Sequence, residues 1–319
     1  MKKTTLYFDS RDGETKVYAV RYEPEESALV DGKPRAILQI VHGMAEYVER
    51  YEEFAEYFTA KGFVVTGDDH LGHGKTVPEG GVYGYFCKQD PATVVVRDVH
   101  RLKKMTQSLY PGVPYFILGH SMGSFILRNY IMRYGTGIQG AIIMGTGMPS
   151  RTLVNAALAV VTVKKCLMGS RHKCEWMSRR LFGGYNKLFG AVKTPNDWLS
   201  RREENVAVYE ADTLCGFHFT ANGFETLFTL IKRGTDPKNM CKIPSGLPIL
   251  LQSGDKDAVG QFGKGVRKTA DALLQAGVKD VELHLYPEDR HEILQEEDRE
   301  LVMTDLYDWI QSRLPGGVG

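Results

Sequence analysis

The most constraining feature of this sequence is a regular alternation between short apolar runs and longer amphipathic segments. The short runs are rich in Val, Ile and aromatic residues, and Gly or Pro bounds them. This alternation is typical of parallel β-strands joined by crossover helices, and it predicts an α/β fold. Parallel strands are predicted at residues 36–41, 63–67, 115–118, 141–144, 248–252 and 281–286.

The segments between these runs carry apolar residues at i, i+3 and i+4, which is the spacing of one helix face. Near the N-terminus, Asp12-Gly13 separates two further apolar runs and predicts a β-hairpin, so the sheet should begin antiparallel. An amphipathic segment at 297–314 should close the fold as a helix. The other helices are predicted at 51–60, 93–109, 122–134 and 265–275, and the hairpin strands at 4–8 and 16–22.

The alternation stops between Met148 and Leu247, where helical and irregular signals replace strands. Strand signals resume beyond this interval, so an insertion over the carboxyl edge of one sheet explains it better than a separate domain. A chain of 319 residues has room for one large domain of this kind. We therefore predict a core formed by residues 1–147 and 248–319, with a cap inserted at 148–247.

Composition excludes some classes of partner. The chain has 40 Lys and Arg against 39 Asp and Glu, so a net charge of +1 provides no global field for nucleic acid. The first residues contain no apolar run of a secretory signal, and the expected compartment is the cytoplasm. The 5 cysteines are odd in number and lack CxxC spacing, which predicts reduced structural thiols and no zinc site.

The strongest chemical signal is the motif Gly119-His120-Ser121-Met122-Gly123, directly after a predicted strand and directly before a predicted helix. A nucleophilic serine at such a strand-to-helix turn needs a strained backbone, and the flanking glycines make room for it. The amino end of the helix also offers backbone N–H groups where negative charge would develop. The motif predicts that Ser121 is a nucleophile.

A serine hydroxyl is a weak nucleophile, so it requires a carboxylate and a histidine base later in the chain. Among the later histidines, His218 lies inside the predicted cap, and His284 lies in mid-strand with its side chain on a sheet face. His291 follows that strand by one short loop, where a base could reach back to Ser121. We therefore predict His291 as the base.

The acid should leave the preceding strand, and two residues compete in the segment Ser253-Gly254-Asp255-Lys256-Asp257. Side chains two positions apart need not point the same way, so this pattern leaves Asp255 and Asp257 open. The aspartate that is not the acid should cap a turn.

An oxyanion hole normally uses two backbone N–H groups, one after the nucleophile and one in the loop after the first central strand. Met122 would supply the first. Met44 would supply the second from His42-Gly43-Met44, where Gly43 lets the backbone approach closely.

The segment 69–74, DHLGHG, combines two histidines, an aspartate and two glycines. Three ligand types in a glycine-rich turn are a weak metal signal, so a tight loop packed beside the active site is the favoured interpretation. No metal and no other cofactor is expected.

The predicted cap contains an uncharged run at residues 152–163 that ends at Lys164-Lys165. The run is too short to span a bilayer. It could form a buried cap helix, or a helix whose apolar face lines an acyl channel or transiently touches a membrane surface.

Taken together, these motifs resemble the monoacylglycerol lipase and lysophospholipase family of α/β-hydrolases over nearly the whole chain. HGMAEYVERY, DDHLGHGKT and GHSMGS are similar to the oxyanion segment, second loop and nucleophile elbow of that family. QSGDKD and EDRHEI are similar to its acid and base segments, and the cap words DWLSR and LCGF resemble the bacterial branch. The resemblance implies an α/β-hydrolase fold, with a mostly parallel central sheet flanked by helices and an inserted helical cap.

The resemblance also implies roles for individual residues. In that family the acid stands three positions after a glycine, which favours Asp257 over Asp255. The implied nucleophile, acid and base are Ser121, Asp257 and His291, and the implied oxyanion donors are Met44 and Met122. 

Glu46 and Arg50 match polar positions near the glycerol-binding end of monoacylglycerol lipases. Leu294 departs from the family, because animal members carry at this position a second histidine that helps to hold glycerol. The resemblance therefore implies a single-chain lipid ester as the substrate and leaves the alcohol group open.

The expected reaction is hydrolysis of a carboxylic ester through an acyl-enzyme. One alternative is a serine aminopeptidase similar to proline iminopeptidases, which would need cap carboxylates to hold a free α-amine. The other is a non-catalytic binding protein that kept the fold, which the intact nucleophile, acid and base disfavour. The carboxylates available to an aminopeptidase are Glu203, Glu204, Glu210 and Asp212.

Overall fold

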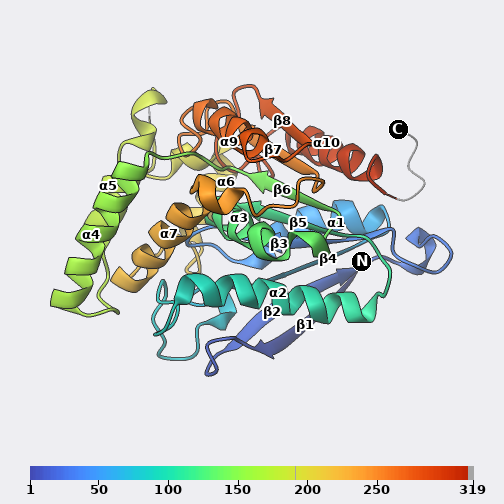
Figure 1. Ribbon diagram of the computed structural model, residues 1–319, viewed down its shortest axis with the longest axis horizontal. Coiled ribbons are helices and arrows are strands. Elements are labelled where there is room, and N and C mark those ends of the chain that lie inside the picture. The colour runs from blue at the N-terminus through green and yellow to red at the C-terminus, as the bar shows by residue number, and fades with distance from the viewer. Residues whose placement is uncertain (191, 315–319) are drawn as a thin grey trace.

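One sheet of eight strands organises the molecule, in the order β1-β2-β4-β3-β5-β6-β7-β8 (Figure 1). The computed structural model describes residues 1–190 and 192–314. β1 pairs with β2 and β2 with β4 in antiparallel fashion, and the other neighbours are parallel. The strands are β1 (Lys2–Asp9), β2 (Lys16–Glu23), β3 (Ala36–Val41), β4 (Phe63–Asp68), β5 (Tyr115–His120), β6 (Gly140–Met144), β7 (Ile249–Gly254) and β8 (Val281–Tyr286).

These strands confirm the predicted sheet, including its antiparallel beginning. β3 and β8 begin and end where the sequence predicts, and the ends of the others differ by only one or two residues. Every residue of the central strands β3 to β7 is buried. Strands covered on both faces read as continuous apolar runs, which is why the sequence identifies them well.

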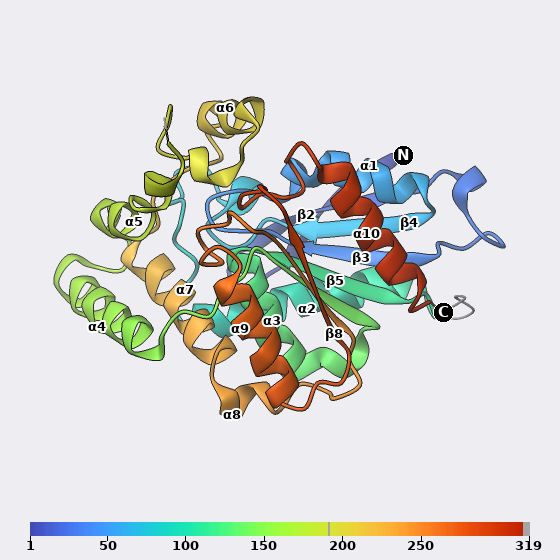
Figure 2. The same ribbon diagram turned by 90° about the horizontal axis from the view of Figure 1, so that it is seen from above.

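Helices cover both faces of the sheet, as the turned view shows (Figure 2). Successive residues of β5 point to opposite sides, so Phe116 packs in the core beneath α1 and α10, and Ile117 packs in the core beneath α2, α3 and α9. The bounds are α1 (Glu52–Ala60), α2 (Pro91–Leu109), α3 (Met122–Tyr134), α9 (Lys264–Gln275) and α10 (Arg299–Gln311).

The interval between β6 and β7 adds no strand to the sheet in its described residues, 145–190 and 192–248. α7 packs against both α3 and α4, so it joins the inserted segment to the main body. No helix in the described part of the chain is long and apolar enough to span a membrane. The helices of this interval are α4 (Arg151–Met168), α5 (Glu175–Phe182), α6 (Glu203–Ala211), α7 (Ala221–Gly234) and α8 (Pro237–Met240).

Candidate active site

Ser121 occupies a sharp turn between β5 and α3, with φ of 54° and ψ of −118°. Residues other than glycine rarely adopt these backbone angles, so the surrounding structure must hold Ser121 in this conformation. The neighbouring glycines make the turn possible. A Cβ at Gly119 would collide with the Gly123 carbonyl, and a Cβ at Gly123 would collide with the Val41 carbonyl.

His291 and Asp257 form a buried pair from two different loops. His291 Nδ1 lies 3.0 Å from Asp257 Oδ1, and the two side chains are 2% and 0% exposed. Asp257 also accepts hydrogen bonds from Ser253 Oγ at 3.1 Å and the Val259 N–H at 2.8 Å. Burial alone would raise the pKa of Asp257, but the charge and hydrogen bond of His291 lower this pKa below its ordinary value.

Asp255, the competing aspartate, does not contact His291. It accepts a hydrogen bond from the Glu288 N–H at 2.9 Å and lies 3.3 Å from Lys256 Nζ. Asp255 therefore caps a turn at the sheet edge, and only Asp257 is in contact with the histidine.

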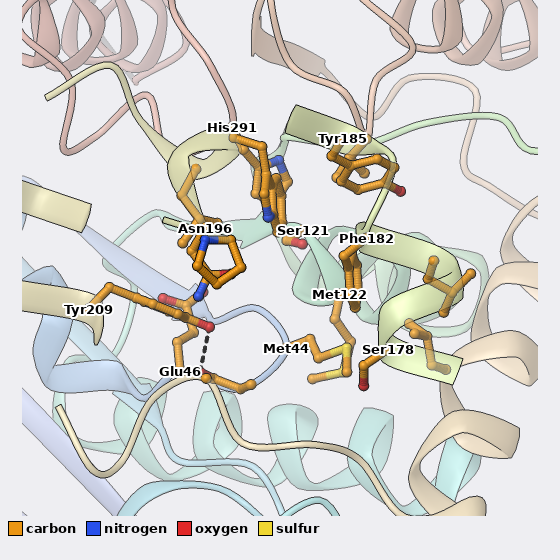
Figure 3. A pocket seen from close by; sticks show the side chains of 18 of the residues that line it. Met44, Glu46, Ser121, Met122, Ser178, Phe182, Tyr185, Asn196, Tyr209 and His291 are labelled. Atoms are coloured by element: carbon orange, nitrogen blue, oxygen red, sulfur yellow. Dashed lines mark hydrogen bonds between the residues drawn. The ribbon is translucent and has the colours of Figure 1, made fainter. Parts of the chain in front are cut away.

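Ser121 and His291 line the same pocket and lie side by side in Figure 3. Met44 and Met122 line it too, from the loop after β3 and from the first residue of α3. The β3 loop comes close to the serine, because a Cβ at Gly43 would lie 3.0 Å from Ser121 Cβ. The structure thus brings together all five residues predicted for catalysis and oxyanion binding.

A buried charged cluster lies beside this group. Arg50 donates to Glu46 Oε2 at 2.9 Å and to both oxygens of Glu292 at 2.7 and 2.9 Å. Asn205 of α6 donates to Glu292 at 2.7 Å, and the Tyr209 ring lies 4.9 Å from the Arg50 guanidinium. Burial would raise the pKa of Glu292, but the charge and hydrogen bonds of Arg50 lower it. Glu46 and Glu292 line the pocket, while Arg50 lies behind them as their shared counter-ion.

The pocket has a volume of about 470 Å³ and two different ends. Figure 3 shows Glu46, Asn196 and Tyr209 on one side of Ser121, and the rings of Phe182 and Tyr185, with Ser178, on the other. The polar end is marked by Glu46, Asn196 and Tyr209, with Glu292 linked to Glu46 through Arg50 and Glu210 bonded to Asn196. Phe182 marks the apolar end, and the other apolar residues that line the pocket include Phe125, Leu181, Leu227, Phe228 and Ile231.

Comparisons with known proteins identify the family of this chain. A family model described as serine aminopeptidase, S33, matches residues 32–298, which is most of the chain. The chain belongs to this family. The match covers residues 32–147 and 248–298 of the predicted core and the whole inserted segment.

The proteins similar to this chain include lipases and esterases. The monoacylglycerol lipase of Mycolicibacterium smegmatis is 29% identical over 89% of this chain and 91% of its own length. Human monoglyceride lipase is 40% identical, over 30% of this chain and 29% of its own. A solved structure of a thermostable carboxyl esterase from Bacillus coagulans, in complex with glycerol, has 32% identity and a TM-score of 0.89, and covers 98% of this chain and 99% of its own. These relatives confirm the predicted family, the α/β-hydrolase fold and the class of enzyme, a serine hydrolase.

The S33 chain uses its DHLGHG segment for packing. The rings of His42 and His70 stack at 4.0 Å, and burial lowers the pKa of His73 to about 3. Asp69 accepts hydrogen bonds from the Val48 N–H at 2.8 Å and the Lys75 N–H at 2.7 Å. This histidine cluster packs against the loop after β3, because the His70 N–H donates to His42 Nε2 at 3.0 Å. No group of metal ligands occurs among the described residues.

The uncharged run at 152–163 forms most of α4, and the interpretation of it as a buried helix is wrong. Only Val154 and Val161 of α4 are buried, whereas Leu153 and Val163 are 64% and 58% exposed. No residue of α4 lines the pocket, so the helix does not form the acyl channel either. Helical periodicity identified the element but not which surface its apolar residues would meet.

No sequence pattern assigned a role to Glu292, Asn205 or Tyr209. The position of Glu292 directly after His291 was the available signal, since a residue there must lie near the pocket. Asn205 and Tyr209 belong to α6, and only the tertiary structure shows which face of that helix meets the core.

Proposed function

We propose that this chain hydrolyses carboxylic esters that join one long acyl chain to a small neutral alcohol bearing hydroxyl groups. The observation that supports this most is the two-ended pocket on either side of Ser121. An acyl chain needs an apolar wall, and hydroxyl groups need acceptors held in place. Within this proposal, residues 148–247 form the cap and residues 1–147 and 248–319 form the core.

The proposed reaction uses Ser121 as the nucleophile and His291 as the base. Asp257 accepts the hydrogen bond from His291 Nδ1, which leaves Nε2 free to take the Ser121 proton during attack on the ester carbonyl. The Met44 and Met122 N–H groups would hold the oxyanion, each contributing about 2.7–4 kcal/mol of transition-state stabilisation. His291 then protonates the departing alcohol and activates the water that releases the fatty acid.

The polar end of the pocket supports a neutral alcohol over a phosphate-bearing head group. Glu46 and Glu292 both line it and share the Arg50 guanidinium, so this cation is already paired and offers no free charge to a phosphate. Leu294 is buried in the core and cannot supply the polar contact that a histidine makes there in animal monoacylglycerol lipases. Glu292 is the nearest replacement, because it does line the pocket.

Aminopeptidase activity is the second candidate, and the family description raises it. An α-ammonium group needs a carboxylate without another cation, but Glu46 and Glu292 share Arg50, and Glu203 is paired with Lys193. Asp212 accepts from Tyr47 at 2.8 Å. Of Glu203, Glu204, Glu210 and Asp212, only Glu210 lines the pocket, and Asn196 donates to it at 2.9 Å. The pairing favours ester hydrolysis; faster turnover of a proline arylamide than of a p-nitrophenyl ester would reverse this choice.

Contact with a membrane surface is a further part of the proposal. Leu153, Val160, Val163 and Leu167 of α4 are exposed and fall on one face of the helix. An apolar face of this kind partitions into the boundary between lipid head groups and acyl chains. Co-sedimentation with phosphatidylcholine vesicles should fall when Leu153 and Val163 are both replaced by Ser.

The main test is a kinetic panel of monoacylglycerols, lysophospholipids and p-nitrophenyl esters. We expect the monoacylglycerols to have the highest kcat/KM, and Ser121→Ala to lose both hydrolysis and labelling by a fluorophosphonate. Equal activity in wild type and Ser121→Ala would refute the mechanism.

The acid can be tested with a matched pair of variants. We expect Asp257→Asn to lower kcat by about 10⁴-fold, because the amide would hold His291 in the wrong tautomer. Asp255→Asn makes the same chemical change two residues away, where the side chain caps a turn, and should leave kcat close to wild type. A large loss in the second variant alone would move the acid to Asp255.

A further inference from the structure

His120, the residue before Ser121, is only 4% exposed and has a hydrogen-bond partner at each ring nitrogen. Nδ1 lies 3.3 Å from Glu46 Oε1, and Nε2 lies 3.1 Å from the carbonyl oxygen of His291. A backbone carbonyl can only accept a hydrogen bond, and so can an ionised carboxylate. Both nitrogens of His120 must therefore donate.

A neutral imidazole carries one N–H and the imidazolium carries two. From these contacts we infer that His120 is an imidazolium at neutral pH, and that it is a positioning residue which ties the loop after β3 to the loop of the proposed base. The expected effect of His120 on the reaction rate rests on the proposed function. The charge state of its ring does not.

Glu46 connects the imidazolium to the oxyanion loop. The same Glu46 oxygen that faces His120 accepts from the Gly43 N–H at 2.5 Å and from the Tyr51 hydroxyl at 3.0 Å. The other oxygen accepts from Arg50. Gly43 immediately precedes Met44, so the position of the Met44 N–H depends on the carboxylate that His120 helps to hold.

The second contact reaches the loop of the proposed base. His120 Nε2 holds the backbone of His291, and the two rings pack with centroids 4.7 Å apart. Gly145, which directly follows β6, packs against both rings, because a Cβ there would lie 3.1 Å from each of them. One ring therefore bridges the two loops that must act on the same ester carbonyl.

The charged groups around His120 favour the imidazolium. Burial would lower the pKa of His120, but its hydrogen bond to Glu46 and the negative charge of Glu46 raise it above its ordinary value, with a further contribution from Glu292. The titratable groups that face this site from each packed element are Glu46 and His42 of the β3 loop, Arg50 and Tyr51 after it, and His291 and Glu292 of the base loop.

The charge state can be measured directly by NMR with ¹⁵N-labelled histidine side chains, using His120→Gln to assign the resonances. We expect both ring nitrogens of His120 to show protonated shifts at pH 7.5. Glu46→Gln should lower the pH at which the ring titrates, and Tyr51→Phe, which removes a neutral donor from the same oxygen, should leave the ring charged. One protonated and one unprotonated nitrogen in wild type at pH 7.5 would overturn the inference.

The kinetic readout is the alkaline limb of kcat/KM for a p-nitrophenyl ester. His120→Gln should lower kcat/KM by about tenfold, or about 1.4 kcal/mol, and should remove the limb due to this ring. In Glu46→Gln the limb should move to lower pH. A uniform loss of rate at every pH, with an unmoved limb, would show that His120 is only structural. Failure of the proposed function looks different, because wild type would then lack ester hydrolysis and fluorophosphonate labelling while the NMR result stood.

Discussion

The inserted segment has two parts that are attached to the core in different ways. The part beside the polar end of the pocket, η6 (Asp197–Leu199) with α6, is bonded to the loop of the proposed base. The Glu292 N–H donates to the Leu199 carbonyl at 2.7 Å, and Ser200 Oγ donates to Glu296 at 2.9 Å. The bond from Ser200 is buried, and the hydrogen bond between Asn205 and Glu292 is partly buried.

The part that carries α4 and α5 is attached mainly through α7, and Lys173 between the two helices also donates to the Tyr83 carbonyl. α4 packs on α7, where Lys165 pairs with Glu225 at 2.5 Å and both side chains are partly exposed. Most of the remaining α4 surface faces solvent, and Figure 1 shows α4 and α5 at the edge of the molecule. Local stability follows buried contacts and protected hydrogen bonds, so the α6 part should open less readily than the α4 part.

The difference matches the two tasks that we propose for the pocket. Hydroxyl groups require acceptors at fixed positions, and the α6 part holds Glu292 and Tyr209 through the core itself. An acyl chain requires only apolar surface, which tolerates movement of the helices that cover it. Specificity for the alcohol should therefore reside in the firmly attached part.

The largest expected effect comes from breaking the buried attachment. Glu292→Ala removes the bidentate partner of Arg50 and leaves part of a buried charge uncompensated, so we expect a loss of about 3–5 kcal/mol in the free energy of unfolding. Glu225→Ala removes the carboxylate of the other attachment, where exposure limits the expected loss to about 0–1 kcal/mol. Urea denaturation of both variants checks this contrast, and equal losses would mean that the two parts are attached equally well.

An intermediate effect is expected from pH. The pKa of Glu46 and that of Glu292 are lower in the folded protein than in the unfolded chain, so at acid pH the unfolded chain binds more protons. Their contribution to stability is present above the unfolded pKa of about 4.3 and is lost as the pH falls through the folded values. The urea concentration at the unfolding midpoint should therefore decrease as the pH is lowered below about 4.3. This decrease with pH should be less steep in Glu292→Gln than in wild type. Parallel slopes would contradict a stabilising role for this carboxylate.

The smallest effect is expected on the α4 surface. Leu153→Ser and Val163→Ser alter exposed side chains that line no pocket, so stability should change by less than about 0.5 kcal/mol. Hydrolysis of a soluble p-nitrophenyl ester should stay close to wild type. Val161→Ser, on the buried face of the same helix, is the matched control and should destabilise clearly. A loss of more than about 1.5 kcal/mol at Leu153 would show that this face is covered after all.

Much of the sheet could be predicted because its causes are local. The runs that became β3 and β5 are apolar on both faces and bounded by turn residues, and the Asp12-Gly13 pair marks the hairpin between β1 and β2. The family resemblance added the choice of Asp257 over Asp255, and the contact of Asp257 with His291 agrees with that choice. Its role as the acid remains a proposal until the variants are measured.

Other features depended on contacts between distant parts of the chain. The helical period of residues 152–163 is equally compatible with a buried and an exposed apolar face, and the interpretation as a buried helix was wrong. The pairing of Arg50 with Glu292 joins residues that lie 242 positions apart. No local pattern predicts such a pair, because its stability comes from the burial that the whole fold provides.

By itself, the sequence determined the order of the strands along the chain, the strained turn at Ser121 and the family to which the chain belongs, since these depend on short segments and their spacing. Only the tertiary structure decided that Glu46 and Glu292 share one buried arginine and that His120 has an acceptor at each nitrogen. The physical reason is that hydrogen bonding and charge pairing in a buried site are properties of the atoms that folding brings together.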